Sequence, residues 1–382
     1  MQRIFVKIAI SILLFQTSFQ HVCGCSKKTT DAAAWDADLR DGGTQDAQLD
    51  GSNADASQPQ IVERVTVGLA ASLPVVIDLL TFEDRQFVAY YNDERKLTVA
   101  SRVLGSSDWT FYVTDSIVPW DGHNSVQMAL DTENQLHVAG NMHNVPLNYY
   151  RTTIPLDITS LTKVEAMVGT EESSVTYPTF LAGPQGELIF HYRDGSSGSG
   201  VRIFNKYDVA NRQWVRLIDE PLFAGPNMNA YPHGPVFLAG AYHVAWVWRD
   251  TSASSTNHDP SYARSTDLVH WTKADGTELT LPLTPTNSDV VEPVPTNSGL
   301  ENYNIKVSVD AQGSPIVSYH TWDASGDTQL YNARFEGNAW NIHQTSDWTG
   351  HYIPGSTDNH LYIYPVTVAD DGILTQAFWH WI

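Results

Sequence analysis

The chain has 382 residues and carries 22 Lys and Arg against 43 Asp and Glu, a formal net charge of −21 at pH 7. A chain this acidic lacks the broad positive surface of a nucleic-acid-binding protein, so we expect no nucleic-acid partner. Its two cysteines, Cys23 and Cys25, both lie near the N-terminus. The remainder therefore has neither a disulfide nor a thiolate metal site.

The N-terminal segment has the parts of an export signal: basic residues, an apolar run at 8–15 and small residues at 22–25. The run is too short to span a bilayer. Val-Cys-Gly-Cys at 22–25 resembles a bacterial lipobox, which implies cleavage before Cys25 and its lipidation. We expect a lipoprotein signal peptide at 1–25 and an exported protein anchored to the outer membrane or cell surface of a bacterium. The alternative is an ordinary secretory signal cut nearby.

Residues 26–60 are rich in Asp, Ala, Gly, Ser and Gln. Such a composition cannot bury enough apolar surface to fold, so it predicts a disordered tether. The remainder, 61–382, is expected to form the catalytic domain and to act as a monomer.

Six copies of one pattern follow residue 61: an apolar alternating run, a polar turn, and a second apolar run rich in aromatics. A period of about fifty residues with several short strands per copy is typical of a β-propeller. We therefore predict an all-β propeller with six visible blade repeats, in which tryptophans late in the copies seal neighbouring blades. The turn residues are Arg85, Gln135, Gly186, Gly240, Gly313 and Gly372, and the tryptophans are Trp109, Trp214, Trp271 and Trp340.

The two ends of the repeat region carry a further expectation. The first copy is predicted to begin with a strand at Val75–Asp78. The last copy reaches Ile382 after two strands, so we expect an N-terminal strand such as Glu63–Val67 to close the ring.

Four polar side chains stand next to expected strand ends. His123 and Tyr177 precede the first strands of two copies, while His143 and Arg193 follow the second strands. Because a propeller brings equivalent strand ends to one rim, we expect these four side chains to meet there.

These residue types suit β-elimination at a uronic acid. The proton beside a carboxylate is very weakly acidic, and the guanidinium of Arg193 can neutralise that carboxylate. A neutral His123 can then take the proton, and Tyr177 can protonate the leaving oxygen. His143 would share the base role or orient the carboxylate. The four residues predict a lyase that acts on an acidic polysaccharide.

Each residue also has a simpler interpretation. The histidines can be hydrogen-bonded turn residues, Tyr177 can pack between blades, and Arg193 can form an ion pair with Asp194. The negative net charge opposes a polyanionic substrate, so cations must gather locally in the cleft. The candidates for this are Arg193, Arg202, Arg249 and Arg264.

Eight short motifs occur in order between about Ile61 and Pro282. They are Trp120-Asp121-Gly122-His123-Asn124, Val138-Ala139-Gly140-Asn141-Met142-His143, Tyr149-Tyr150-Arg151-Thr152, Thr176-Tyr177-Pro178, Tyr192-Arg193-Asp194-Gly195-Ser196-Ser197-Gly198, Asn229-Ala230-Tyr231-Pro232, Trp246-Val247-Trp248-Arg249 and Asn257-His258-Asp259. Together they resemble the BNR-repeat family that contains the propeller-type ulvan lyases.

The resemblance implies elimination at a uronic acid next to a sulfated rhamnose, as in ulvan. It matches His123 to a base, Tyr177 to an acid, and His143 and Arg193 to groups that hold the substrate. Family members of this kind have seven blades, and some hold a structural metal with the help of cysteine. The folded part here lacks cysteine, so a structural calcium or zinc ion has no support in the sequence, and no cofactor or metal ligand is predicted.

Six further residues are predicted to bind the sugar chain around the cleft. The alternatives are that Arg249 is only a charge emerging from a blade end and that 257–259 is only a polar loop. The six are Asn124, Tyr192, Tyr231, Arg249, Asn257 and His258.

Two other functions remain open. Residues 265–271 resemble the aspartate-box turn of sialidases and other hydrolase propellers, in which Asp267 and Trp271 would close a hairpin, so a glycoside hydrolase is one alternative. Hydrolysis favours paired carboxylates, and no comparably ordered acidic pair accompanies the motifs. A noncatalytic glycan-binding surface lipoprotein is the other, because propellers host both.

Overall fold

The computed structural model describes residues 6–13, 61–225, 227–355, 360–369 and 371–381. The predictions for Cys25 and for the tether at 26–60 lie outside these residues. The chain divides into two compact units, Met1–Gly122 and His123–Ile382, which are described separately. In the described residues, no helix has the length and apolar character needed to cross a membrane.

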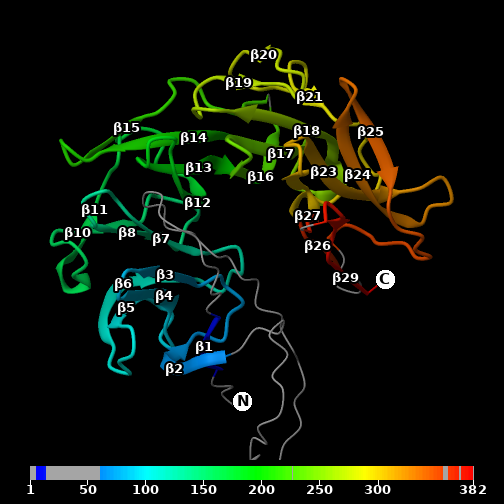
Figure 1. The fold of residues 1–382 in the computed structure, drawn as a ribbon. Coiled ribbons are helices and arrows are strands. Elements are labelled where there is room, and N and C mark those ends of the chain that lie inside the picture. Colours follow the sequence, from blue (N-terminus) through cyan, green and yellow to red (C-terminus); the bar gives the residue numbers. More distant parts are fainter. Residues whose placement is uncertain (1–5, 14–60, 226, 356–359, 370, 382) are drawn as a thin grey trace, which may run out of the picture. The chain divides into compact units, whose positions relative to one another are not determined.

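The first unit contains two antiparallel sheets (Figure 1). Strand β1 (Val6–Leu13) pairs with β2 (Ile61–Ala70), which includes the segment expected to close a ring. The other sheet has the order β3-β4-β5-β6. Its strands are β3 (Asp78–Phe82), β4 (Arg85–Tyr91), β5 (Lys96–Val103) and β6 (Thr110–Ile117).

The predicted first strand at Val75–Asp78 was placed too early, because β3 begins only at Asp78. The backbone N–H of Val75 donates to the carbonyl of Leu73 at 2.8 Å, in a tight turn around Pro74. Because the N–H of Val75 donates within the turn, it cannot donate to a neighbouring strand, and β3 starts later in the chain.

The second unit contains four antiparallel sheets of four or more strands, in which most neighbouring strands also follow each other in the chain (Figure 1). The helices among the described residues are 3-10 helices of one turn: η1 (Ile158–Ser160), η2 (Ser254–Thr256) and η3 (Asn302–Asn304). The strands of the first two sheets are β7 (Val126–Leu130), β8 (Leu136–Gly140), β10 (Tyr149–Thr152) and β11 (Leu161–Val164), then β9 (His143–Val145), β12 (Val175–Ala182), β13 (Leu188–Ser196), β14 (Ser199–Asp208) and β15 (Gln213–Arg216).

The remaining sheets follow in the same way. The third consists of β16 (Asn229–Leu238), β17 (Ala241–Arg249), β18 (Asn257–Ser265), β19 (Trp271–Thr272), β20 (Glu278–Leu279) and β21 (Asp289–Val290). The fourth consists of β22 (Lys306–Val309), β23 (Pro315–Trp322), β24 (Thr328–Glu336) and β25 (Ala339–Gln344). Two strand pairs end the described chain: β26 (His360–Ile363) with β29 (Phe378–Trp381), and β27 (Thr367–Val368) with β28 (Leu374–Thr375).

The all-β prediction is therefore confirmed, and each predicted copy contains an antiparallel hairpin at its turn residue. The last copy is a two-residue ladder, β27 with β28. The closed ring and the number of blades stay predictions.

Consecutive sheets of the second unit pack against each other through a hydrophobic cluster. Trp214 lies in the cluster between the first and second sheets, and Trp271 lies between the second and third. Trp340 contacts Tyr262 of the third sheet with ring centroids 5.3 Å apart. These tryptophans seal neighbouring sheets as predicted, and each lies in the first two residues of its strand.

The packing also aligns the first strands of successive sheets. β7 lies beside β12, β16 lies beside β22, and η3 lies against both β16 and β26. These neighbouring elements bring residues that are far apart in sequence close together in space.

Candidate functional site

Three predicted side chains form a row of neighbouring rings, which we call the stack; its first two rings are nearly parallel and its last two are tilted by 32°. His123 is exposed just before β7, and its ring lies 4.6 Å from the ring of His143, with 19° between the planes. The ring of His143 lies 5.8 Å from that of Tyr177. His143 begins β9, which pairs with β12 so that His143 faces Thr176, the residue before Tyr177. The pairing of these two strands is what brings the histidine to the tyrosine.

Tyr177 has an unusual backbone conformation. Its φ angle is 53°, in the left-handed region, at a break in the β12–β13 register between Thr176 and Thr179. A bulge of this kind re-aims a side chain, and a non-glycine residue held there costs about 1–3 kcal/mol. The fold therefore accepts strain at the residue that the sequence assigns as the acid.

Arg193 joins the stack from β13. Its Cζ lies 5.1 Å from the centre of the Tyr177 ring, and its side chain is only 4% exposed. Nε donates to the Gly195 carbonyl at 3.2 Å, and Nη1 donates to the Tyr231 hydroxyl at 3.4 Å. Nη2 is buried and has no hydrogen-bond partner. A buried guanidinium N–H without an acceptor is costly, so this group is suited to receive an anion.

A second arginine lies directly opposite the first. Arg202 on β14 pairs with Arg193 and is 7% exposed. Burial, together with the charge of Arg193, lowers the pKa of Arg202 to about 9. Its Nη1 lies 3.4 Å from Nδ1 of His191, whose pKa is held well below its ordinary value by burial and by Arg202. A neutral His191 thus serves as acceptor to the buried cation.

Neither of these arginines forms an ion pair with a carboxylate in the described part of the chain. The alternative that Arg193 pairs with Asp194 is therefore wrong. The two residues are adjacent in β13, and adjacent strand residues point to opposite faces of the sheet. Two unneutralised buried cations create a strongly positive spot in an acidic protein.

Tyr231 and Arg249 extend the same cluster. Arg249 lies with its Cζ 5.0 Å from the centre of the Tyr231 ring, and Arg193 approaches that ring at 5.8 Å. The Tyr231 hydroxyl lies 3.0 Å from Oγ of Ser197. Burial alone would raise the pKa of Tyr231, but the Ser197 hydrogen bond and the two arginines together lower it. These neighbours therefore favour the ionised form of Tyr231 more than water does.

Ser197 was not predicted, and its position depends on a glycine. It lies at the tip of the β13–β14 hairpin, followed by Gly198 with a φ of 73°. A Cβ on Gly198 would stand 2.4 Å from the backbone carbon of Thr251, just beyond Arg249. The close approach brings the hairpin tip to the third sheet, and the Ser-Ser-Gly motif was the available signal.

The other predicted residues divide into two groups. Asn257 is buried opposite Arg249, and its Oδ1 has no hydrogen-bond partner, so it lies at the edge of the cluster. Asn124 is buried beside His123 in the chain. His258 instead bridges two carboxylates, Asp259 and Asp250, at 3.0 Å each. These hydrogen bonds, led by that to Asp259, raise the pKa of His258 against the effect of burial.

Two predicted residues are not brought to the cluster. Tyr192 is fully buried in the core between the first and second sheets, and its hydroxyl accepts from Arg216 at 3.4 Å. Burial raises the pKa of Tyr192 to about 12. Tyr192 points away because it neighbours Arg193 in a strand, so the sugar-binding prediction for it does not fit its position. Arg264 pairs with His243 and Thr272, in the outer part of the third sheet.

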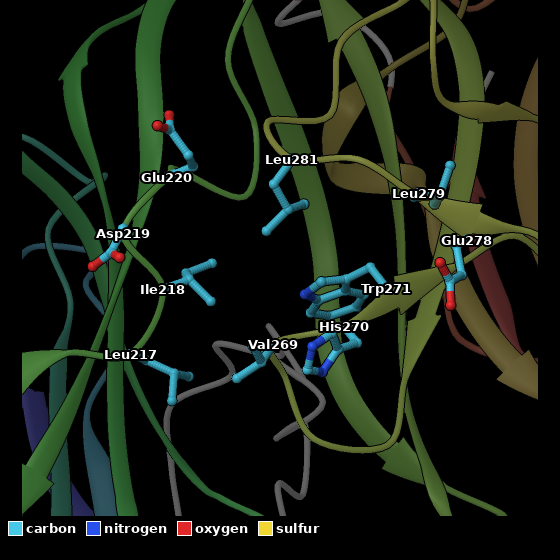
Figure 2. Close-up of a pocket in the computed structure, with 10 residues that line it drawn as sticks. All are labelled: Leu217, Ile218, Asp219, Glu220, Val269, His270, Trp271, Glu278, Leu279 and Leu281. Atoms are coloured by element: carbon cyan, nitrogen blue, oxygen red, sulfur yellow. The ribbon is translucent and has the colours of Figure 1, made fainter.

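A separate cavity of about 420 Å³ opens between residues 217–220 and the β19–β20 region, as Figure 2 shows. Asp219 and Glu220 stand on one side and Glu278 on the other, over a wall that includes Trp271. None of the predicted site residues lines it. Its rim is acidic, which does not suit an acidic glycan.

The aspartate-box prediction is confirmed as a structural turn. Asp267 Oδ1 accepts hydrogen bonds from the backbone N–H groups of Val269 and His270 at 2.8 and 2.7 Å. The turn joins β18 to β19, and Trp271 is 1% exposed. The Asp267 carboxylate thus stabilises the hairpin turn.

Comparison with known proteins gives a consistent result. The model of the BNR repeat-containing family matches residues 85–348. The short isoform of an ulvan lyase from Alteromonas sp. (strain LOR) is 30% identical over 139 residues, which cover 31% of this chain and 24% of that enzyme. The match thus spans about a quarter of the length of the curated relative.

Solved structures of lyases have a similar fold. The polysaccharide lyase Uly1 superposes with a TM-score of 0.61 and 15% identity, covering 86% of each chain. A PL25 ulvan lyase superposes with a TM-score of 0.58 and 15% identity, covering 81% of this chain and 82% of that one. A PL25 ulvan lyase has also been solved bound to -[GlcA(1-4)Rha3S]-, a fragment of glucuronic acid linked to 3-sulfated rhamnose. At this identity the likeness shows the fold.

Proposed function

Because the chain belongs to the BNR repeat-containing family, we propose that it is a polysaccharide lyase that cleaves an acidic, uronate-containing polysaccharide by β-elimination. One observation carries the proposal: the stack of His123, His143 and Tyr177 is joined by Arg193, which has a buried, unpartnered N–H group. The similarity to ulvan lyases supports the same reaction class.

In the proposed reaction, the uronate carboxylate meets Arg193 Nη2. This N–H has no protein acceptor, so a carboxylate oxygen satisfies it without breaking an existing hydrogen bond. Arg202 adds a second positive charge beside Arg193, on the neighbouring strand. Their combined field lowers the cost of placing negative charge on the carbon next to the carboxylate.

The proton then moves to a histidine. His123 is the exposed member of the stack and takes the proton from C5 of the uronate. The electron pair left on C5 forms a C4–C5 double bond as the C4–O bond breaks. His143, stacked beneath His123, supports the imidazolium and orients the carboxylate.

Tyr177 donates its phenolic proton to the departing oxygen. Arg193 lies over its ring and stabilises the phenolate that remains. The products are a sugar with an unsaturated uronate at its nonreducing end and a sugar with a new reducing end. To complete the cycle, His123 releases its extra proton to solvent, and the Tyr177 phenolate takes up one proton from solvent.

Ulvan is the proposed substrate, since the curated relative is an ulvan lyase and a similarly folded lyase has been solved with a sulfated glucuronate fragment. We also propose a closed propeller and a monomeric, exported lipoprotein anchored through Cys25.

The test is incubation of the purified protein with ulvan while ultraviolet absorbance and reducing ends are both followed. A lyase produces both signals in equal amounts, because each cleavage creates one double bond and one reducing end. Reducing ends without ultraviolet absorbance would mean hydrolysis. Neither signal, with retained binding, would mean a noncatalytic glycan-binding protein.

A further inference from the structure

Two exposed tyrosines form a paired surface away from the catalytic stack. Tyr303 in η3 is 43% exposed and Tyr362 in β26 is 38% exposed. Their rings lie 6.5 Å apart with only 10° between the planes. We call them the distal pair. Aromatic faces of this kind are suited to contact the apolar C–H faces of sugar rings.

A buried asparagine holds the distal pair in place. Asn304 is 0% exposed, donates through Nδ2 to the Leu361 carbonyl at 2.9 Å, and accepts the N–H of Ile363 at 3.1 Å. These two backbone groups flank Tyr362. The Asn304 side chain thus pairs with the backbone of β26 as a neighbouring strand would. Because Tyr303 directly precedes Asn304 in the chain, this pairing holds Tyr362 beside Tyr303.

The distal pair also has a positive charge. Lys306 is 6% exposed, its Nζ lies 4.7 Å from the centre of the Tyr362 ring, and the same atom donates to the Tyr303 carbonyl at 2.6 Å. Burial lowers the pKa of Lys306 to about 8. Lys306 forms no ion pair with a carboxylate in the described part of the chain. The charge under the tyrosines is therefore not neutralised by the protein.

A series of neighbouring side chains connects the catalytic cluster to the distal pair. From Tyr231 the series passes to Arg249, whose Nη1 lies 3.3 Å from the side-chain amide of Asn302. Asn302 directly precedes Tyr303 in η3. Glu301 is the opposing charge on this path, but it is 3% exposed, and burial raises its pKa.

We infer that Tyr303, Tyr362 and Lys306 form a distal subsite for the same acidic polysaccharide chain that occupies the catalytic cluster, so that sugar residues remote from the cleaved bond stack on the tyrosines while their carboxylate or sulfate groups face the lysine. This inference rests on the proposed function. The occupant is one polymer because Arg193, Tyr231, Arg249 and Asn302 lie next to one another in turn, and Asn302 directly precedes Tyr303 in the chain.

The experiment measures polymer binding apart from turnover. In a His123→Ala background, affinity electrophoresis in gels containing ulvan compares Tyr362→Ala and Lys306→Met with the parent. Lys306→Met keeps the approximate length of the side chain and removes the buried charge together with the hydrogen bond to the Tyr303 carbonyl. Phe237→Ala is the control, because Phe237 is exposed (58%) at the other end of β16 from Tyr231.

Each variant at the distal pair should weaken retardation by ulvan about tenfold, the effect of losing one moderate contact, while Phe237→Ala matches the parent. With His123 present, the variants should raise KM on the polymer and leave turnover of a tetrasaccharide unchanged. Parent-like retardation of both variants, or no retardation of the parent, would overturn the inference. Loss of retardation in the variants together with no ultraviolet product from the wild type would overturn the proposed function and keep the subsite.

Discussion

Replacing Arg193 by lysine tests the proposed carboxylate contact without removing positive charge. The guanidinium uses Nε for Gly195 and Nη1 for Tyr231, which leaves Nη2 for the substrate. A lysine has one nitrogen on a flexible chain and cannot keep these contacts while it also offers a fixed donor. Substrate recognition should therefore suffer more than folding.

The magnitude follows from the contact that is lost. A hydrogen bond to a charged group contributes about 1.5–3 kcal/mol, which corresponds to a loss of roughly 10- to 150-fold in kcat/KM. The fold keeps a charge at the same place, so the midpoint of thermal unfolding should move by only a few degrees, since about 1 kcal/mol shifts it by roughly 2–4 °C in a domain of this size. Initial rates from the ultraviolet assay on ulvan give the first quantity and circular dichroism gives the second.

The control is Arg264→Lys, since Arg264 lies beside His243 and Thr272 instead of in the cluster. It should keep the wild-type kcat/KM. An Arg193→Lys enzyme whose kcat/KM stays within about twofold of wild type would refute the carboxylate contact.

Three further predictions follow from individual contacts. Tyr177→Phe keeps the ring beside Arg193 and removes the hydroxyl that donates the proton, so kcat should fall about 100- to 10,000-fold with little change in the melting curve; wild-type turnover would exclude Tyr177 as the acid. His258 has a higher pKa in the folded state than in the unfolded state, where it is about 6.5, so its protonation stabilises the fold. This contribution to the free energy of unfolding is fully present below the unfolded pKa, and it is lost as the pH rises through the folded pKa. His258→Gln should therefore lower the denaturant midpoint in acid and much less in alkali, and an equal loss at both pH values would contradict the two ion pairs. Trp271→Ala should lower the free energy of unfolding by about 3–5 kcal/mol in chemical denaturation, because Trp271 is 1% exposed, and a loss below 1 kcal/mol would contradict its sealing role.

The sequence predicted the hairpins well, because turn residues and alternating apolar runs are local signals. It also predicted that four side chains near strand ends would meet, and the structure brings His123, His143, Tyr177 and Arg193 together. Tyr192 could have been excluded from the same signals, since it alternates with Arg193 in one strand.

Other features depend on pairings between distant segments. The left-handed conformation of Tyr177 arises where β12 meets β9 and β13, and a local pattern does not encode it. Arg202 becomes a buried partner of Arg193 only through the register of β13 with β14. The start of β3 was misplaced because the turn at Pro74 takes up the N–H of Val75.

The central claim is that the bond breaks by elimination at a uronate, with His123 as the base. Mass spectrometry of the smallest products released from ulvan tests it most directly. The account predicts fragments that lack one water relative to the hydrolysis products when the wild-type protein is used, and no such fragments with His123→Ala. Fully hydrated fragments from the wild type, or unsaturated fragments at the wild-type rate from His123→Ala, would contradict it.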